Sequence, residues 1–228
     1  MNRLRYVLLA LLLACLPAAS SLFSDAFPAF PPVDQGPQKL DFVGYRSQLL
    51  AAIQKKDAAA LKPFLATNIE YSFGAEKPGV EGFFKVWKMP SAKSGLWKEL
   101  SQVVGNGGSF TDANQFVAPY WYSNWPKERD NLEWEAVSAR SIPVYFKPSR
   151  QSKQLPTIGH CLVRRNDGSK NQTHAGWTCI DLPESMQNPY KVESVFVETT
   201  NLHPMLGHRA TFQRVNGRWQ MISFVAGD

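Results

Sequence analysis

Apolar residues recur at helical spacing in the segment 40–66. Phe42, Tyr45 and Leu49 are three and four residues apart, so they share one face of a helix. Asp57 is a typical N-cap residue, and it divides the segment into a long helix and a short second one. The pattern therefore predicts two consecutive helices with a buried face.

Three shorter elements follow this segment. Residues 69–74 (I-E-Y-S-F-G) are typical of a strand that ends in a turn. The segments 80–89 and 94–105 each place bulky apolar residues on one side, and Gly105 is a natural stop for the second. We therefore expect two more helices in the first half of the folded chain.

The pattern changes in the second half. Between 140 and 202, four short β-rich runs are separated by clusters of Pro, Gly, Asp and Asn. The runs are R-S-I-P-V-Y-F, G-H-C-L-V-R-R, A-G-W-T-C-I-D-L and V-F-V-E-T-T-N-L. Short strands at this spacing are typical of a small closed β-barrel.

The end of the chain predicts a β-hairpin. The runs T-F-Q-R-V and R-W-Q-M-I-S-F-V flank Asn216 and Gly217, and an Asn-Gly pair suits the positive φ angles of a two-residue turn. We expect this hairpin, within 204–228, to return to the helical segment and complete one discontinuous domain. A C-terminal extension of the barrel is the alternative.

The first 21 residues have the three parts of a secretory signal peptide. Arg3 and Arg5 precede an apolar run that is too short to remain as a membrane span, and small residues follow it. We expect cleavage between Ser20 and Phe27 and a periplasmic protein. Lipidation of Cys15, which would attach the protein to a membrane, is the alternative.

The mature N-terminus and the charge add two expectations. Residues 22–39 contain four prolines and no periodicity, so we interpret them as an extended linker, although their three phenylalanines could pack onto the body. The formal net charge of +6 falls to +4 when Arg3 and Arg5 are removed. Since the remaining charge is spread out rather than gathered in a basic stripe, a nucleic-acid partner is disfavoured.

Three landmarks make the segment 137–203 similar to a bacterial Src homology 3-like domain. They are the opening V-Y-x-x-P-S-x-x-S, Trp177 before the C-I-D-L strand, and the F-V-E-x-x-x-L exit. The resemblance implies a small β-barrel that serves as a non-catalytic attachment or peptide-binding module of envelope proteins. In such a small fold Trp177 is expected in the core, and Tyr145 is the expected surface contact.

The segment 40–136 carries a second resemblance. The strings S-F-G-A-E-K-P-G-V-E-G-F-F-K-V-W, L-W-K-E-L and F-V-A-P-Y, with the ending G-R-W-Q-M-I-S-F-V-A-G-D, are similar to an exported proteobacterial family that carries a Src homology 3-like domain. Its helices and terminal hairpin also resemble nuclear-transport-factor-two-like folds. These resemblances imply an α+β protein: an α+β domain at 40–136, a barrel at 137–203, and a hairpin at 204–228.

Patterns that carry catalysis or bind metals are absent from the sequence. The carboxylates are scattered, the four histidines have no zinc-ligand spacing, and there is no G-x-S-x-G or phosphate-binding loop. We therefore expect no metal, no cofactor and no enzyme activity. An envelope enzyme or small-ligand binder with a pocket in 40–136 is the alternative.

An aromatic cluster supplies the candidate binding residues. Tyr120, Trp121, Tyr122 and Trp125 lie in a loop-like stretch, where rings can stack on sugars or form a groove for a Pro-rich peptide. Burial of these rings where the domain meets the barrel is the simpler interpretation. Together with Tyr145, they are the predicted contacts for a cell-wall polymer or an envelope protein.

The two remaining cysteines predict a disulfide. Cys161 and Cys179 belong to runs that we interpret as neighbouring antiparallel strands, and their midpoint at Lys170 falls in the polar stretch N-D-G-S-K-N-Q-T-H. Opposed cysteines in such a ladder lie near bonding distance, and the periplasm is oxidising. A pair of buried thiols is the alternative. The overall expectation is an exported, non-catalytic binding protein whose ligand is peptidoglycan, a peptide or a partner protein.

Overall fold

The computed structural model describes residues 23–74, 77–166, 168 and 174–227. The predicted signal peptide and Cys15 lie outside these residues. The described chain is a mixed α+β structure, about 30% helix and 32% strand, in agreement with the predicted fold class. None of its helices is both long and apolar enough to cross a bilayer.

The chain divides into two compact units, each made from two separate stretches. The strand unit comprises residues up to Pro31 together with Asp130–Pro204, and the helix–sheet unit comprises Pro32–Arg129 together with Met205–Asp228. The predicted boundary at 136 is therefore displaced, because residues 130–136 belong to the strand unit.

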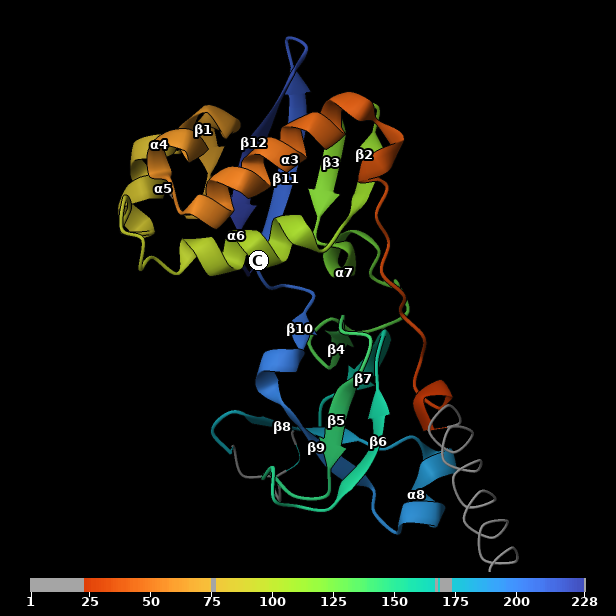
Figure 1. The fold of residues 1–228 in the computed structure, drawn as a ribbon. Helices are drawn as coiled ribbons and strands as arrows, with labels where there is room; N and C mark the ends of the chain where they lie inside the picture. Colours follow the sequence, from red (N-terminus) through yellow and green to blue (C-terminus); the bar gives the residue numbers. More distant parts are fainter. Residues whose placement is uncertain (1–22, 75–76, 167, 169–173, 228) are drawn as a thin grey trace, which may run out of the picture. The chain divides into compact units, whose positions relative to one another are not determined.

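The helix–sheet unit contains a five-stranded sheet, and helices cover it (Figure 1). Its elements in chain order are η1 (Gly36–Gln38), α3 (Leu40–Lys55), α4 (Ala58–Leu61), η2 (Lys62–Phe64), β1 (Leu65–Glu70), α5 (Val80–Val86), α6 (Leu96–Gly105), β2 (Ser109–Asp112), β3 (Gln115–Ala118), α7 (Tyr120–Ser123), β11 (Arg209–Val215) and β12 (Arg218–Val225).

The C-terminal hairpin lies inside this sheet. The strand order is β1-β12-β11-β3-β2, with β1 parallel to β12 and the other pairs antiparallel. The predicted turn is confirmed, since Asn216 and Gly217 have φ angles of 50° and 77°. The hairpin therefore joins two strands that precede it in the sequence, β3 by about 90 residues and β1 by about 150.

The predicted helices are present with shorter bounds. Asp57 caps α4, where its Oδ1 accepts a hydrogen bond from the Ala60 amide at 3.0 Å. The strand predicted at 69–74 is wrong in position: β1 begins at Leu65, because the helical run that contains Pro63 ends there and the backbone becomes extended. The chain thus reaches the sheet four residues earlier than the pattern indicates.

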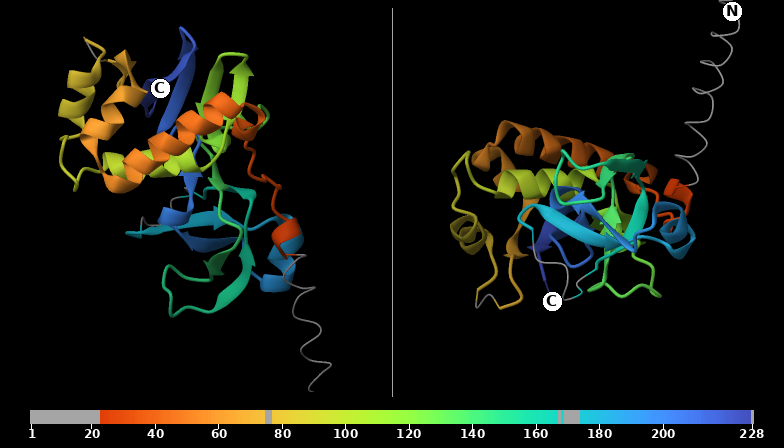
Figure 2. Two further views of the ribbon diagram at one scale, coloured as in Figure 1. Left: turned by 45° about the horizontal axis from the view of Figure 1, so that its top comes forward. Right: turned by 90° about the horizontal axis from the view of Figure 1, so that it is seen from below.

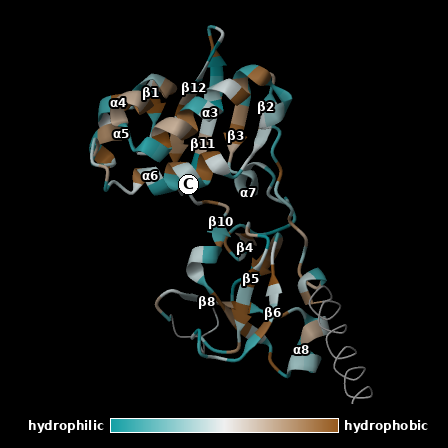
Figure 3. Ribbon diagram, viewed as in Figure 1, coloured by the Kyte–Doolittle hydropathy of each residue, from teal (hydrophilic) through white to brown (hydrophobic). Residues whose placement is uncertain are grey.

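One face of the sheet is covered by α3 and α6, which run side by side (Figures 1 and 2). Both helices carry brown and teal along their length in Figure 3, as expected for helices with one buried face. Phe42 and Leu49 of α3 are fully buried in the core that they form with the sheet. The periodicity that predicts the helices is therefore the pattern of this contact.

The strand unit contains two sheets, a three-stranded one in the order β10-β4-β7 and a four-stranded one in the order β6-β5-β9-β8. Its elements in chain order are β4 (Trp134–Val137), β5 (Ile142–Tyr145), β6 (Gln154–Ile158), β7 (Cys161–Arg164), β8 (Trp177–Asp181), α8 (Glu184–Tyr190), β9 (Ser194–Glu198), η3 (Thr199–Asn201) and β10 (His203–Pro204).

The prediction of a closed barrel is wrong. The two sheets are not closed into one barrel, because β7 pairs along its whole length with β4 rather than with β8. In the described residues, β7 and β8 approach each other at a bridge between Arg165 and Ile180, just beyond the end of β7. The four predicted runs correspond to β5, β7, β8 and β9, whereas β6 has no counterpart among them.

The interpretation of 22–39 as a linker is wrong for the residues that the structure describes. Phe23, Phe27 and Phe30 are buried at 1%, 4% and 6% exposure. Phe23 and Phe27 belong to the core of the strand unit, and Ala29 forms a bridge with Cys161. Apolar burial of three rings stabilises the segment more than its prolines favour an extended tether.

Candidate functional site

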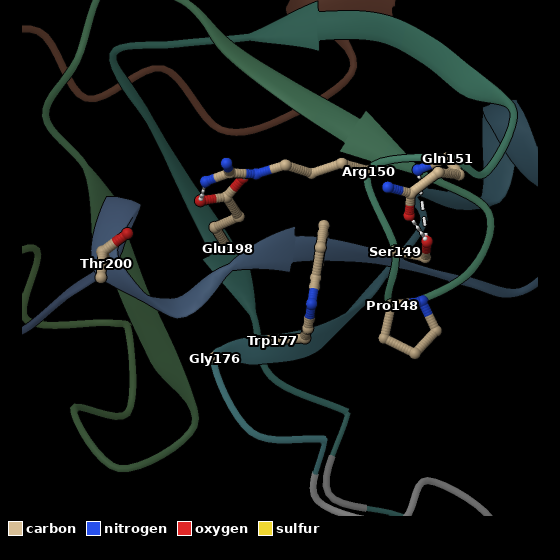
Figure 4. Close-up of a pocket in the computed structure, with 8 residues that line it drawn as sticks. All are labelled: Pro148, Ser149, Arg150, Gln151, Gly176, Trp177, Glu198 and Thr200. Atoms are coloured by element: carbon tan, nitrogen blue, oxygen red, sulfur yellow. Dashed lines mark hydrogen bonds and ion pairs between the residues drawn. The ribbon is translucent and has the colours of Figure 1, made fainter.

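An open groove in the strand unit has a volume of about 460 Å³. Figure 4 shows the eight residues that line it, and we call it the Trp177 groove. Its lining consists of Pro148, Ser149, Arg150, Gln151, Gly176, Trp177, Glu198 and Thr200. The residues come from the loop after β5, the start of β8 and the end of β9.

The loop after β5 is held by hydrogen bonds between its own residues. The Phe146 amide donates to the Lys153 carbonyl at 3.1 Å, and the Lys147 amide donates to Ser152 Oγ at 3.0 Å. The Ser152 amide in turn donates to the Ser149 carbonyl at 3.0 Å. The two serines of the P-S-x-x-S motif therefore shape the loop that places Arg150 over the groove.

Trp177 stands at the centre of the groove (Figure 4). It is the first residue of β8, opposite Glu198 on β9, and it follows Gly176, whose φ of 83° turns the chain into the strand. The Trp177 ring meets the Tyr145 ring edge to face, with centroids 5.3 Å apart and an interplanar angle of 89°. Such a contact fixes the orientation of the indole.

The structure reverses the roles predicted for these two rings. Tyr145 is 8% exposed and lies in the core, whereas Trp177 is only half-buried and lines the groove. The register of β5, β9 and β8 places both rings on the same face of the four-stranded sheet, where they meet edge to face. Tyr145 is therefore a positioning residue for Trp177 rather than a surface contact.

Arg150 and Glu198 form a two-pronged ion pair beside Trp177. Arg150 Nε is 2.7 Å from Glu198 Oε1, and Arg150 Nη2 is 2.8 Å from Glu198 Oε2. This hydrogen bonding holds the pKa of the Glu198 carboxyl below its ordinary value and raises the pKa of the Arg150 guanidinium. Both carboxylate oxygens are engaged, so Glu198 is poorly placed to act as a general base.

The predicted aromatic contacts lie in the helix–sheet unit and are mostly internal. Tyr120 is fully buried and Trp121 is 4% exposed, so neither can offer a ring face to a ligand. Tyr122 lies under the guanidinium of Arg209, 4.6 Å from its ring centroid. The stacking-platform interpretation is therefore wrong for Tyr120 and Trp121, because their rings are needed for the packing around α7.

Trp125, the fourth member of the predicted cluster, is half-buried. Its Nε1 donates a hydrogen bond to the Arg129 carbonyl at 3.0 Å. The indole therefore closes the loop that follows α7. The burial of Tyr120 and Trp121 agrees with the simpler interpretation of the cluster as packing residues.

The predicted disulfide is absent. The structure holds Cys161 and Cys179 as buried thiols in strands of different sheets. The bridge between Arg165 and Ile180 sets a register in which the position opposite Cys161 is that of Glu184, beyond the end of β8. This register differs by five positions from the one that would pair Cys161 with Cys179, so the midpoint argument gives the wrong partner.

We expect two titratable thiols in the mature protein, and slow reaction of Cys161 while the chain is folded. Burial raises the pKa of the Cys161 thiol from its ordinary value of 9.0 to about 12, and the thiolate is the reactive form. Titration with a thiol reagent at about pH 8 should be slow in buffer and complete in denaturant. Protein purified without reductant that shows no thiols in denaturant would contradict this expectation.

The raised pKa also fixes the sign of a pH effect. Because the folded state favours the protonated thiol, its contribution to stability is present below the ordinary pKa and is lost as the pH rises toward about 12. The same reagent should therefore react faster with the folded protein at about pH 10 than at about pH 8.

Sequence reasoning missed Arg150 and Glu198 as groove residues and assigned Trp177 to the core. A signal for Trp177 was present: Gly176 ends a polar stretch immediately before it, and a large ring at the mouth of a turn often remains accessible. Comparison with protein-family models, with curated proteins and with solved structures finds no match to the chain. The groove is therefore interpreted from its own geometry.

Proposed function

We propose that the chain is an exported, non-catalytic binding protein of the cell envelope that holds a peptide at the Trp177 groove. The peptide belongs to a cell-wall polymer or to an envelope protein. The observation that carries the proposal is the half-buried Trp177 ring in an open groove, where its edge-to-face contact with Tyr145 fixes its orientation. Peptide-binding grooves typically contain an accessible aromatic ring with hydroxyl and amide groups beside it.

The polar groups of the groove favour binding over catalysis. Glu198 is the carboxylate of its lining, and Arg150 occupies both oxygens. Ser149 Oγ donates to Gln151 Oε1 at 2.6 Å and has no histidine beside it in the lining. A nucleophile needs an adjacent base, and this groove offers a neutralised ion pair instead.

Export is supported by the predicted signal peptide, and the burial of Phe23 supports a cleavage site before that residue. Cleavage after Ala26 would remove Phe23, a buried member of the core of the strand unit. Cleavage between Ser20 and Phe23 keeps that ring. We propose that the mature chain begins in this interval and resides in the periplasm.

We also propose that each of the two units is related to a known fold family. The P-S-R-Q-S loop and the place of Trp177 support a relation of the strand unit to bacterial Src homology 3-like domains, with two sheets that stay apart. The helices α3 and α6 on one face of a five-stranded sheet support a nuclear-transport-factor-two-like origin of the other unit.

The Trp177→Ala variant should weaken binding to purified wall sacculi by about tenfold or more, because a central Trp carries a large share of the binding energy of a groove. Trp177→Phe should retain most of the binding, since a ring remains. Raising the salt to about 0.5 M should change little, because Arg150 and Glu198 neutralise each other. Co-sedimentation with sacculi measures all three effects.

Two results would refute this assignment. Binding of Trp177→Ala at the wild-type level would show that the ring is not the contact. Complete loss of wild-type binding at high salt would show that the positive surface charge is the source of affinity. Circular dichroism of each variant separates loss of the contact from loss of the fold.

A further inference from the structure

The sheet of the helix–sheet unit has a second face, opposite α3 and α6, that is polar and hollow. Side chains alternate across each strand. On β11, Phe212 points into the core, while its neighbours Thr211 and Gln213 point to the other face. A hollow of about 570 Å³ lies on that other face, within the range of ordinary ligand sites.

Three glutamines lie side by side across the middle of this face. Gln213 on β11 is directly opposite Gln115 on β3 and directly opposite Gln220 on β12. We call these residues the glutamine row. Strands favour β-branched and aromatic residues, so three adjacent amides across three strands are not what strand propensity produces.

The positions next to the glutamine row on the same face also carry polar, uncharged side chains. Thr211 is opposite Ser223 in the next pair along the hairpin. The full lining of the hollow is Ala66, Thr67, Asn68, Glu70, Gln115, Thr211, Gln213, Val215, Gln220, Ile222 and Ser223. This lining contains hydroxyl and amide groups and the three apolar residues Ala66, Val215 and Ile222. It is free of basic side chains and aromatic rings.

The amides of the row are available for a ligand. Gln213 and Gln220 are only partly exposed, and within the described residues their side chains make no hydrogen bond. Gln115 uses its carbonyl oxygen, which accepts from Thr111 Oγ1 at 2.7 Å, and keeps its NH₂. Partly buried polar groups normally find partners, so an arrangement that leaves these amides open is suited to an external partner.

The charge of the hollow selects the class of partner. Glu70 is the single ionisable residue of the lining, so an anionic ligand has no countercharge there. An apolar ligand would leave the amides without hydrogen bonds, at a cost in free energy. An uncharged ligand whose groups both donate and accept hydrogen bonds fits the row.

The spacing of the glutamines discriminates between two candidate ligands, a sugar chain and an extended peptide. The row repeats at the distance between strands, about 4.8 Å, whereas groups on one side of an extended peptide repeat every second residue, at about 6.8 Å. Hydroxyl and acetamido groups surround a sugar ring on all sides and need no such repeat. We propose that the glutamine row binds an uncharged glycan that carries hydroxyl and acetamido groups.

This site lies in a different unit from the Trp177 groove, and a soluble glycan that carries no peptide tests it separately. The test uses the full mature chain and a soluble tetramer of N-acetylglucosamine as the probe, with affinity measured by isothermal titration calorimetry. The wild-type protein should bind the probe. The double variant Gln213→Ala, Gln220→Ala should bind at least tenfold more weakly, while Trp177→Ala should bind normally.

A matched control removes two amides elsewhere. The double variant Gln48→Ala, Gln54→Ala changes exposed positions of α3 on the other side of the unit and should leave the affinity unchanged. Chemical-shift changes on adding the probe should gather on β3, β11 and β12. This second measurement needs only the wild-type protein, so it stands even if the double variant of the row is unfolded.

Four outcomes would overturn the proposal. The first is that the probe does not bind, and the second is that it binds equally to the Gln213→Ala, Gln220→Ala variant. The third is that the protein dimerises in sedimentation experiments and Gln213→Arg abolishes the dimer, which would assign the face to a second copy of the chain. A neutral extended peptide that displaces the probe from the row would likewise reject the glycan as its ligand.

Discussion

Phe42→Ala should destabilise the helix–sheet unit by about 3–5 kcal/mol, the usual cost of removing a buried Phe side chain. Phe42 is fully buried, and its ring lies 4.4 Å from that of Phe116 and 4.9 Å from that of Trp219, measured between centroids. Tyr45, Phe110 and Phe212 also have ring centroids within 6.0 Å of it. The substitution leaves a cavity where α3 meets the sheet.

Hydrogen exchange measured by mass spectrometry can locate this loss. Peptides from β11 and β12 should exchange faster in the variant, while those from the strand unit should be unaffected, because the opening free energy is local to a cooperative unit. Leu40→Ala, at a position of the same helix that is 86% exposed, is the matched control and should change little. Equal exchange in Phe42→Ala and Leu40→Ala would reject this view of the core.

Phe23→Ala should destabilise the strand unit by a similar amount, about 3 kcal/mol or more. Phe23 is 1% exposed, and its ring centroid lies 5.8 Å from that of Phe27 and 5.4 Å from that of Tyr190. Removing the ring takes apolar contacts from both the N-terminal segment and α8. Exchange should therefore accelerate in peptides from β5, β9 and α8.

The control for this variant is Asp25→Ala, two residues away and exposed. It should leave exchange of the strand unit unchanged. If Phe23→Ala behaves like Asp25→Ala, the N-terminal segment is a tether after all, and the proposed start of the mature chain before Phe23 loses its support.

The parts of the fold that could be predicted are those with a local cause. Helix α3 follows from the spacing of Phe42, Tyr45 and Leu49, and the hairpin follows from Asn216 and Gly217, since each depends on neighbours in sequence. The burial of Phe23 has no local signal, because rings set among prolines have no period and the core that buries them, including Tyr190, lies more than a hundred residues away in the sequence.

The candidate sites were hard to predict for a similar reason. Whether Tyr145 or Trp177 is exposed depends on which ring covers the other, and that order is set by the pairing of β5, β9 and β8. The glutamine row becomes visible only when the register brings Gln115, Gln213 and Gln220 together from three strands. A sequence gives residue types, whereas these sites depend on long-range pairing.

The position of the C-terminal hairpin has a consequence for the order in which the chain can mature. Strands β11 and β12 stand between β1 and β3 in the sheet, so the earlier strands have no pairing across this gap until the last residues arrive. A chain that is synthesised from its N-terminus can complete the strand unit as soon as residue 204 emerges. The helix–sheet unit must wait for the hairpin, with the helices holding an unfinished core until then.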